Sequence, residues 1–193
     1  LPSRRLMGLI DSSAGPDRIV TTDVGQHQMW AAQHLPLNHP GTFLTSGGLG
    51  TMGFGLPAAL GAALASPESR VICITGDGSI LMNIQELATL AELGMDVSIL
   101  VLNNKHLGLV RQQQELFYGN NVYAAKLGDP DFTRIAAAFG IKSFRADSAD
   151  DPAIGENLKQ GGPLLIEIPS DPAENVFPMV PAGRANREMV GVE

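Results

Sequence analysis

The chain has 193 residues, a length that suits one domain with a core of its own. Its net charge of −7 and the lack of a Lys/Arg run argue against binding to nucleic acid or an anionic membrane. No apolar run reaches transmembrane length, and the single cysteine, Cys73, fits a cytoplasmic location. Because the first residue is leucine, we expect the chain to be a piece or a processed form of something larger.

Short apolar segments alternate with helical patterns along the chain. After a short N-terminal helix and a loop at 12–17, strands are expected at 19–22, 42–45, 71–75, 97–102, 141–144 and 164–168. Helices are expected between them, at 26–33, 55–65, 84–93, 132–139 and 153–159. Several strand segments are unbroken runs of β-branched residues and leucine, which is typical of strands buried on both faces of a parallel sheet. The order predicts an α/β fold, a doubly wound three-layer sandwich with a central, mainly parallel six-stranded sheet and an irregular tail at 170–193.

Oxygen-bearing side chains follow two successive strands. The strand at 71–75 runs into Gly76-Asp77-Gly78, and the strand at 97–102 runs into Asn103-Asn104. Ligands bind at the carboxyl ends of parallel strands, and the glycines allow a ligand to approach the backbone. Carboxylate and amide oxygens are donors that Mg²⁺ takes together with phosphate oxygens, whereas no His/Cys cluster indicates zinc or iron.

Taken singly, each of these motifs is more typical of an ordinary turn. Because both fall at the ends of consecutive buried strands, the pattern favours a metal–diphosphate site over turns alone. Ser79 and Asn83 are expected to cap the helix that begins near residue 84, whose N-terminus would suit a phosphate group.

The spacing of these motifs resembles the signature of thiamine diphosphate enzymes. Gly76-Asp77-Gly78 is followed by 24 residues and then by Asn103-Asn104. In that family the aspartate, the second asparagine and a backbone carbonyl two residues further on hold the metal. The resemblance therefore implies that Mg²⁺ is bound by Asp77, Asn104 and the carbonyl of His106, so that the His106 side chain is not needed as a ligand.

Longer stretches, at 23–30, 45–57 and 178–188, resemble the acetolactate synthases within this family, and the similarity covers nearly the whole chain. It implies that backbone groups of Gly50 and Met52 bind the aminopyrimidine and that the Met52 side chain holds the cofactor in a bent shape. It also implies a set of residues close to the diphosphate: Gln26, His27, Gly76, Gly78 and Ser79. Simpler alternatives are helix capping for Gln26 and His27 and core packing for Met52.

One position departs from the family pattern. Many acetolactate synthases carry a tryptophan after the metal asparagine, where it lines the substrate region and favours 2-ketobutyrate as second substrate. This chain has Gln113 at the matching place, and residues 107–118 look closer to the enterobacterial isozyme I type. The departure puts a preference for 2-ketobutyrate in doubt.

The resemblance implies an enzyme that condenses two 2-keto acids, pyruvate with pyruvate or 2-ketobutyrate, with decarboxylation, in branched-chain amino-acid biosynthesis. We expect residues 1–193 to be its single C-terminal domain, with the pyrimidine domain and an FAD domain upstream of this chain. A glutamate from a neighbouring subunit would complete the site. The isolated chain is therefore expected to be inactive and to bind the cofactor weakly. The full enzyme is expected to be at least a dimer, with a regulatory small subunit as a candidate partner.

Two alternatives stay open. The chain could belong to another thiamine diphosphate carboligase or to a 2-keto acid decarboxylase, which a substrate screen of the full-length protein would distinguish. It could also be a non-catalytic module that binds a magnesium–diphosphate group or only mediates assembly, which calorimetry with thiamine diphosphate would test.

Overall fold

Two unbroken apolar runs form the central strands of the protein. In the computed structural model, which describes residues 2–191, every residue from Val71 to the end of β3 (Arg70–Gly76) is buried, as is all of β4 (Val97–Asn103). The other strands are β1 (Arg18–Thr22), β2 (Phe43–Thr45), β5 (Lys142–Arg145) and β6 (Leu164–Pro169). The six strands lie in the order β2-β1-β3-β4-β6-β5, and all neighbouring pairs are parallel.

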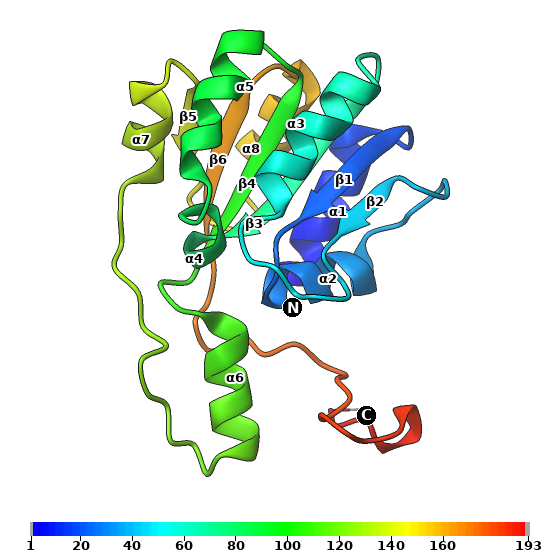
Figure 1. The fold of residues 1–193 in the computed structure, drawn as a ribbon, viewed down its shortest axis with the longest axis vertical. Helices are drawn as coiled ribbons and strands as arrows, with labels where there is room; N and C mark the ends of the chain where they lie inside the picture. Colours follow the sequence, from blue (N-terminus) through cyan, green and yellow to red (C-terminus); the bar gives the residue numbers. More distant parts are fainter. Residues whose placement is uncertain (1, 192–193) are drawn as a thin grey trace.

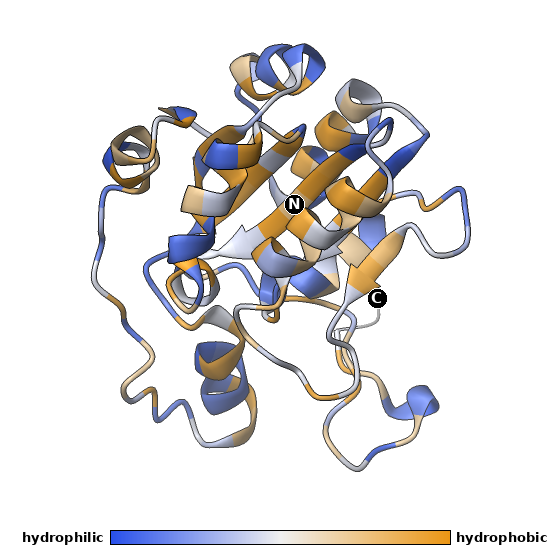
Figure 2. Cartoon of the chain, turned by 45° about the horizontal axis from the view of Figure 1, so that its top comes forward, coloured by the Kyte–Doolittle hydropathy of each residue, from blue (hydrophilic) through white to orange (hydrophobic). Residues whose placement is uncertain are grey.

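Helices cover both faces of this sheet, which separates the hydrophobic core into two layers (Figure 1). Helices α1 (Pro2–Ala14), α2 (Gln26–His34) and α8 (Pro152–Gln160) pack on one face. Helices α3 (Gly55–Ala65), α5 (Leu87–Leu93) and α7 (Phe132–Ala138) pack on the other. The strands are the most hydrophobic part of the chain (Figure 2), because parallel strands between two helix layers expose neither face to water.

The doubly wound three-layer sandwich and its six-stranded parallel sheet are confirmed, and each predicted strand is found within two residues of its expected ends. Two predicted element boundaries are wrong. The loop expected at 12–17 starts later, because α1 continues through Ala14 and buries Ser13 against α8. The helix expected at 84–93 is a 3-10 turn, η1 (Ile84–Glu86), followed by α5.

Ser79 and Asn83 do not cap that helix. Ser79 lies inside a single helical turn, α4 (Asp77–Ile80), and its hydroxyl donates to the carbonyl of Val24 at 3.1 Å. Asn83 precedes η1, but its side-chain amide donates to the carbonyl of Gly53 at 2.7 Å. Both polar groups therefore bond to distant loops in place of the neighbouring helix end.

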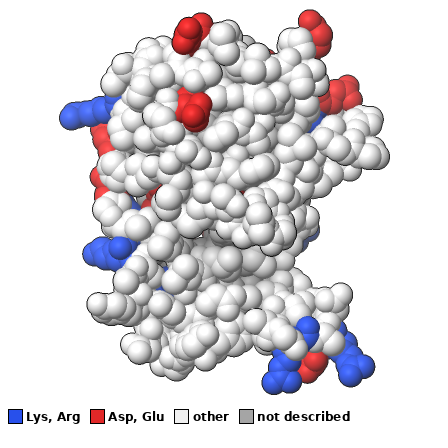
Figure 3. Space-filling view, viewed as in Figure 1, with Lys and Arg blue, Asp and Glu red and all other residues white. Residues whose placement is uncertain are grey.

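Two segments extend beyond the carboxyl ends of the strands. Helix α6 (Gly108–Phe117), which was not expected from the sequence, stands below the sheet, and the C-terminal tail descends from β6 beside it (Figure 1). Among the described residues 170–191, regular structure is limited to a 3-10 turn, η2 (Asn186–Glu188), and a bridge between Met179 and Val190. Charged side chains on the face in Figure 3 lie mainly at its edges and form no broad basic patch.

Within residues 2–191, no helix combines the length and the apolar character that a membrane crossing requires.

Candidate functional site

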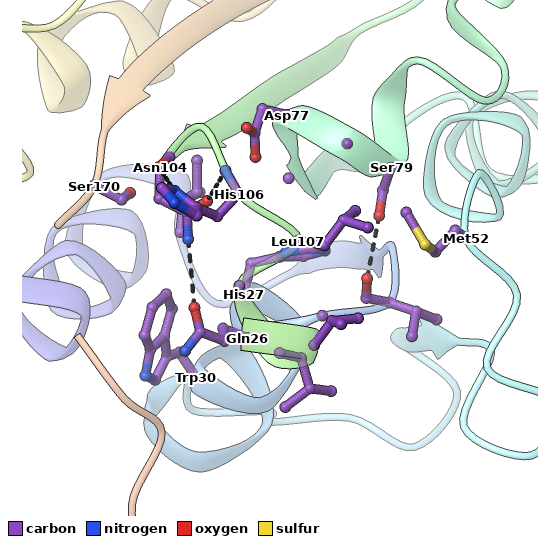
Figure 4. A pocket seen from close by; sticks show the side chains of 18 of the residues that line it. Gln26, His27, Trp30, Met52, Asp77, Ser79, Asn104, His106, Leu107 and Ser170 are labelled. Atoms are coloured by element: carbon purple, nitrogen blue, oxygen red, sulfur yellow. Dashed lines mark hydrogen bonds between the residues drawn. The ribbon is translucent and has the colours of Figure 1, made fainter. Parts of the chain in front are cut away.

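The carboxyl ends of β3 and β4 border a cavity of about 260 Å³. These strands are neighbours, with Gly76 paired to Leu102, so the residues that follow them meet at one edge of the sheet. All the predicted site residues except Gly50 line this cavity, several of them labelled in Figure 4. The predicted residues that line it are Gln26, His27, Met52, Gly76, Asp77, Gly78, Ser79, Asn104, His106 and Gln113.

Asp77 begins α4 directly after β3 and is only 3% exposed. Its Oδ2 is buried and has no hydrogen-bond partner. Burial raises the pKa of Asp77 to about 6, although backbone N–H groups that include those of Gly78 and Lys105 act in the opposite direction. A buried carboxylate oxygen without a partner is costly for the protein alone and fits a bound cation.

The side chains of Asn103 and Asn104 point in different directions and have different partners. The Asn103 amide donates to Asp129 at 3.1 Å and to Glu167 at 2.8 Å, so it points away from the cavity and holds neighbouring elements together. Asn104 faces the cavity, where its Oδ1 accepts the N–H of His106 at 3.0 Å. Asp77, Asn104 and His106 therefore border one cavity.

The His106 ring is held by its own segment. Its Nδ1 lies 2.8 Å from the carbonyl oxygen of Asn104, an arrangement that orients the ring without any metal. Within residues 2–191, no three His, Cys, Asp or Glu side chains gather in a way that could hold a metal ion. A cation next to Asp77 would consequently need amide or carbonyl oxygens as its other protein ligands.

His27 occupies a slot between two glycines. A Cβ atom would lie 2.8 Å from its ring at Gly25 and 2.9 Å from it at Gly76, so both positions require the absence of a side chain. The ring is buried and its Nε2 has no partner. Burial lowers the pKa of His27 to about 4, although the nearby Asp23 carboxylate favours the charged form.

We expect His27 to stay neutral in the folded chain down to about pH 4. The unfolded chain takes up this proton near pH 6.5, so the contribution of His27 to stability is present above that pH. It is lost as the pH falls from about 6.5 to 4, at about 1.4 kcal/mol per unit. NMR titration of the His27 ring checks this, and a ring that titrates near pH 6.5 in the folded chain would contradict it.

Gln26 lies in the first turn of α2, but it does not cap the helix. Its Nε2 donates to Gln112 at 2.8 Å and to the carbonyl of Glu174 at 2.9 Å. Its Oε1 faces the Nδ2 of Asn104 at 3.4 Å (Figure 4). The alternative role of helix capping is therefore not seen for Gln26, which instead connects the cavity wall to the tail.

The loop that precedes α3 supplies the opposite side of the cavity. Met52 is half-buried, and a Cβ atom at Gly78 would lie 3.7 Å from its Cε. The same Cβ would lie 2.8 Å from a methyl group of Leu107 and 2.9 Å from one of Leu127, so a side chain here would displace both leucines. Gly50 is exposed on this loop with a φ of 66° and lies outside the cavity lining.

Several residues of the site were not predicted from the sequence. The cavity is also lined by Trp30, Leu107, Gly108 and Ser170, and Gln112 supports it from behind. The amphipathic pattern of residues 108–117 was the available signal for α6. The residues that this helix buries, Arg111 and Gln112, are polar, so an apolar pattern does not identify its buried face. Gln113 is half-buried and borders both this cavity and a shallow hollow beside α6.

Comparison with known proteins agrees with this geometry. Residues 23–168 match the family described as thiamine pyrophosphate enzyme, C-terminal TPP binding domain, where TPP is thiamine diphosphate. The match covers more than half of the chain and includes the end of β3, α4 and the whole of β4. The chain belongs to this family of C-terminal thiamine diphosphate-binding domains.

Several curated proteins similar to this chain are named as acetolactate synthase large subunits. The chain is 54% identical over 190 residues to the acetolactate synthase isozyme 1 large subunit of Escherichia coli, a match that covers 95% of the chain and 34% of that relative. It is 49% identical to the isozyme 2 large subunit of the same organism, over 90% of the chain and 32% of the relative. It is also 49% identical to an acetolactate synthase large subunit of Parasynechococcus marenigrum, over 92% and 29%. The chain thus spans about a third of the length of these curated relatives.

Proposed function

We propose that this chain is the C-terminal, cofactor-binding domain of an acetolactate synthase catalytic subunit and that it binds thiamine diphosphate through Mg²⁺. Asp77, Asn104 and the main-chain carbonyl of His106 are the proposed protein ligands of the ion. The observation that carries this proposal is the buried, unpartnered Oδ2 of Asp77 in a cavity that Asn104 and His106 also line. The ion in turn would hold the diphosphate oxygens beside the N-terminal end of α4.

The remaining site residues have proposed roles toward the cofactor. Gln26, His27, Gly76 and the backbone of Gly78 and Ser79 surround the diphosphate; His27 can serve as a neutral partner there because its low pKa keeps it uncharged. Backbone groups of Gly50 and Met52 bind the aminopyrimidine, and Met52 supports the bent cofactor.

The activity belongs to a longer subunit of which this chain is one domain. When bound, thiamine diphosphate supplies an electron sink for the carbanion equivalent that remains after a 2-keto acid loses carbon dioxide. The residues of this chain bind the diphosphate, orient the cofactor and exclude water from it. The same proposal includes pyrimidine and FAD domains in the longer subunit and a catalytic glutamate from a neighbouring subunit. It also includes at least a dimeric state, a regulatory small subunit and a cytoplasmic location.

Gln113 is the proposed contact to the second substrate. It borders the cavity on α6. By the family resemblance, this is the place where many acetolactate synthases carry tryptophan. The glutamine side chain is smaller and polar, so we propose that the enzyme discriminates weakly between pyruvate and 2-ketobutyrate. A substrate screen of the full-length subunit tests this and separates acetolactate synthase from other thiamine diphosphate carboligases and decarboxylases.

Titration calorimetry with thiamine diphosphate tests the proposed cofactor role. Binding is expected in the presence of Mg²⁺ and is expected to be lost when the ion is removed with a chelator, because the diphosphate reaches Asp77 only through the cation. Thiamine, which lacks the diphosphate, serves as the control ligand. Equal affinities with and without Mg²⁺, or equal binding of thiamine and thiamine diphosphate, would contradict the proposed site.

A further inference from the structure

Buried side-chain amides link the C-terminal tail to the cavity. Gln112 on α6 is fully buried and does not line the cavity itself. Its Oε1 accepts the N–H of Val176 at 2.9 Å, and its Nε2 donates to the carbonyl of Val176 at 2.9 Å. Because both ends of the amide are held by one tail residue, the oxygen of Gln112 is turned toward Gln26, whose Nε2 lies 2.8 Å away.

Gln26 continues this series of hydrogen bonds from Gln112 to Asn104. Its Nε2 has two acceptors, Gln112 and the carbonyl of Glu174, which together use both hydrogens of the amide. Its Oε1 is thereby left to face the Nδ2 of Asn104 (Figure 4). The Oδ1 of Asn104 then lies on the other side of its amide, where it meets the N–H of His106.

The backbone of the tail determines how the side-chain amides in this series of hydrogen bonds are oriented. A side-chain amide has two ends of nearly equal size, so packing alone does not select which of them faces a cavity. A backbone N–H only donates and a carbonyl only accepts, so Val176 and Glu174 determine how Gln112 and Gln26 are oriented. The orientation of Asn104 is set by Gln26, which faces its Nδ2 at 3.4 Å, together with the N–H of His106, which donates to its Oδ1 at 3.0 Å.

We propose that Gln112 is a positioning residue, which together with tail residues 174–176 sets which atom of the Asn104 amide faces the bound cation. This inference rests on the proposed function, in which Asn104 is a ligand of Mg²⁺. A reversed Asn104 would present its NH₂ group to the cation, and an NH₂ group cannot coordinate Mg²⁺. The tail therefore contributes to the metal site although no residue from 174 to 176 lines the cavity.

The variant Gln112→Met tests this, since methionine has a similar size and lacks both amide groups. The dissociation constant of Mg²⁺, measured by calorimetry at saturating thiamine diphosphate, is expected to rise roughly 10- to 100-fold, as for other residues that orient a metal ligand. Gln114→Met is the matched control on the same helix. Gln114 holds the backbone N–H and carbonyl of Tyr123, both at 3.1 Å, in the way that Gln112 holds Val176, but it has no link to Gln26.

A double-mutant cycle with Gln26→Met distinguishes positioning from a general loss of stability. If Gln112 acts through Gln26, the second substitution adds little to the loss of Mg²⁺ affinity caused by the first. A loss of the same factor in both backgrounds would overturn the proposal, as would an unchanged affinity in Gln112→Met.

The ion-free chain provides a readout that is independent of cofactor binding. In NMR spectra, the side-chain NH₂ signals of Gln26 and Asn104 are expected to shift in Gln112→Met and to stay in place in Gln114→Met. Unchanged Asn104 signals would overturn the positioning role. A failure of the unmutated chain to bind thiamine diphosphate would instead count against the proposed function, and the NMR signals would still decide the role of Gln112.

Discussion

Replacing Asp77 with asparagine is expected to abolish Mg²⁺-dependent binding of thiamine diphosphate and to stabilise the ion-free chain. The substitution removes the charge that would bind the cation, so the loss of affinity should exceed the roughly 10- to 100-fold contributed by residues that only support a ligand. It also removes a buried charge whose Oδ2 has no partner. The two effects have opposite signs because the carboxylate is costly without the ion it is proposed to bind.

The gain in stability should depend on pH in a defined direction. Burial raises the pKa of Asp77 from 3.8 to about 6, so between these two pH values the folded chain retains a proton that the unfolded chain has lost. A difference of about two units corresponds to roughly 3 kcal/mol of destabilisation by Asp77 at pH 7. This cost decreases as the pH falls through 6 and is small at pH 4, because Asp77 is then protonated in the folded chain while the unfolded chain is close to its own pKa of 3.8.

Urea unfolding of Asp77→Asn at pH 7 and pH 4 measures this effect. Asp129→Asn is the control, since Asp129 lies on the same edge of the sheet but accepts hydrogen bonds from Lys105 and Asn103 that lower its pKa. Removing that charge should give no gain in stability. A destabilised Asp77→Asn at pH 7 would contradict the cost assigned to the buried carboxylate. Mg²⁺-dependent binding at the affinity of the unmutated chain would show that Asp77 is not a metal ligand.

Replacing Gly108 with alanine is expected to weaken Mg²⁺-dependent cofactor binding roughly 10- to 100-fold without loss of stability. A Cβ atom at this position would overlap Oε1 of Gln26 and lie 2.7 Å from Nδ2 of Asn104, so the two amides would have to move apart. Gly108 is also the first residue of α6, where alanine is favoured over glycine by up to about 1 kcal/mol. Local helix preference and the geometry of the site therefore act in opposite directions here.

Calorimetry and thermal unfolding of Gly108→Ala separate these two contributions. Gly128→Ala is the matched control, because a Cβ atom there meets nothing within 4 Å. The control should bind the cofactor with unchanged affinity. Full affinity in Gly108→Ala would mean that the contact between Gln26 and Asn104 does not influence the metal site.

The central strands and the positions of the candidate ligands were predictable from local patterns. Unbroken apolar runs such as 71–75 and 97–102 identify strands covered on both faces, and neighbouring parallel strands bring their carboxyl ends together. The convergence of Asp77 and Asn104 on one cavity follows from this rule. Their roles toward Mg²⁺ stay predictions that the calorimetric experiments test.

Local patterns failed where a polar group bonds to a distant segment. Ser79 and Asn83 have the chemistry of helix caps, but Val24 and Gly53 provide their partners. The importance of Gln112 was hidden for the same reason, since its partners are 64 residues away at Val176 and 86 residues away at Gln26. No spacing in the sequence indicates such pairings.

The sequence by itself determined the sheet, its two helix layers and the edge at which Asp77 and Asn104 meet, because hydrophobic periodicity and parallel topology are properties of consecutive residues. Only the tertiary structure decided which polar atoms face the cavity and which are used elsewhere. The folded chain places the backbone of Val176 against Gln112, leaves the Oδ2 of Asp77 without a partner and turns Asn103 toward Glu167. The physical reason is that hydrogen-bond partners are selected by proximity in space, which a chain acquires only when its distant segments pack together.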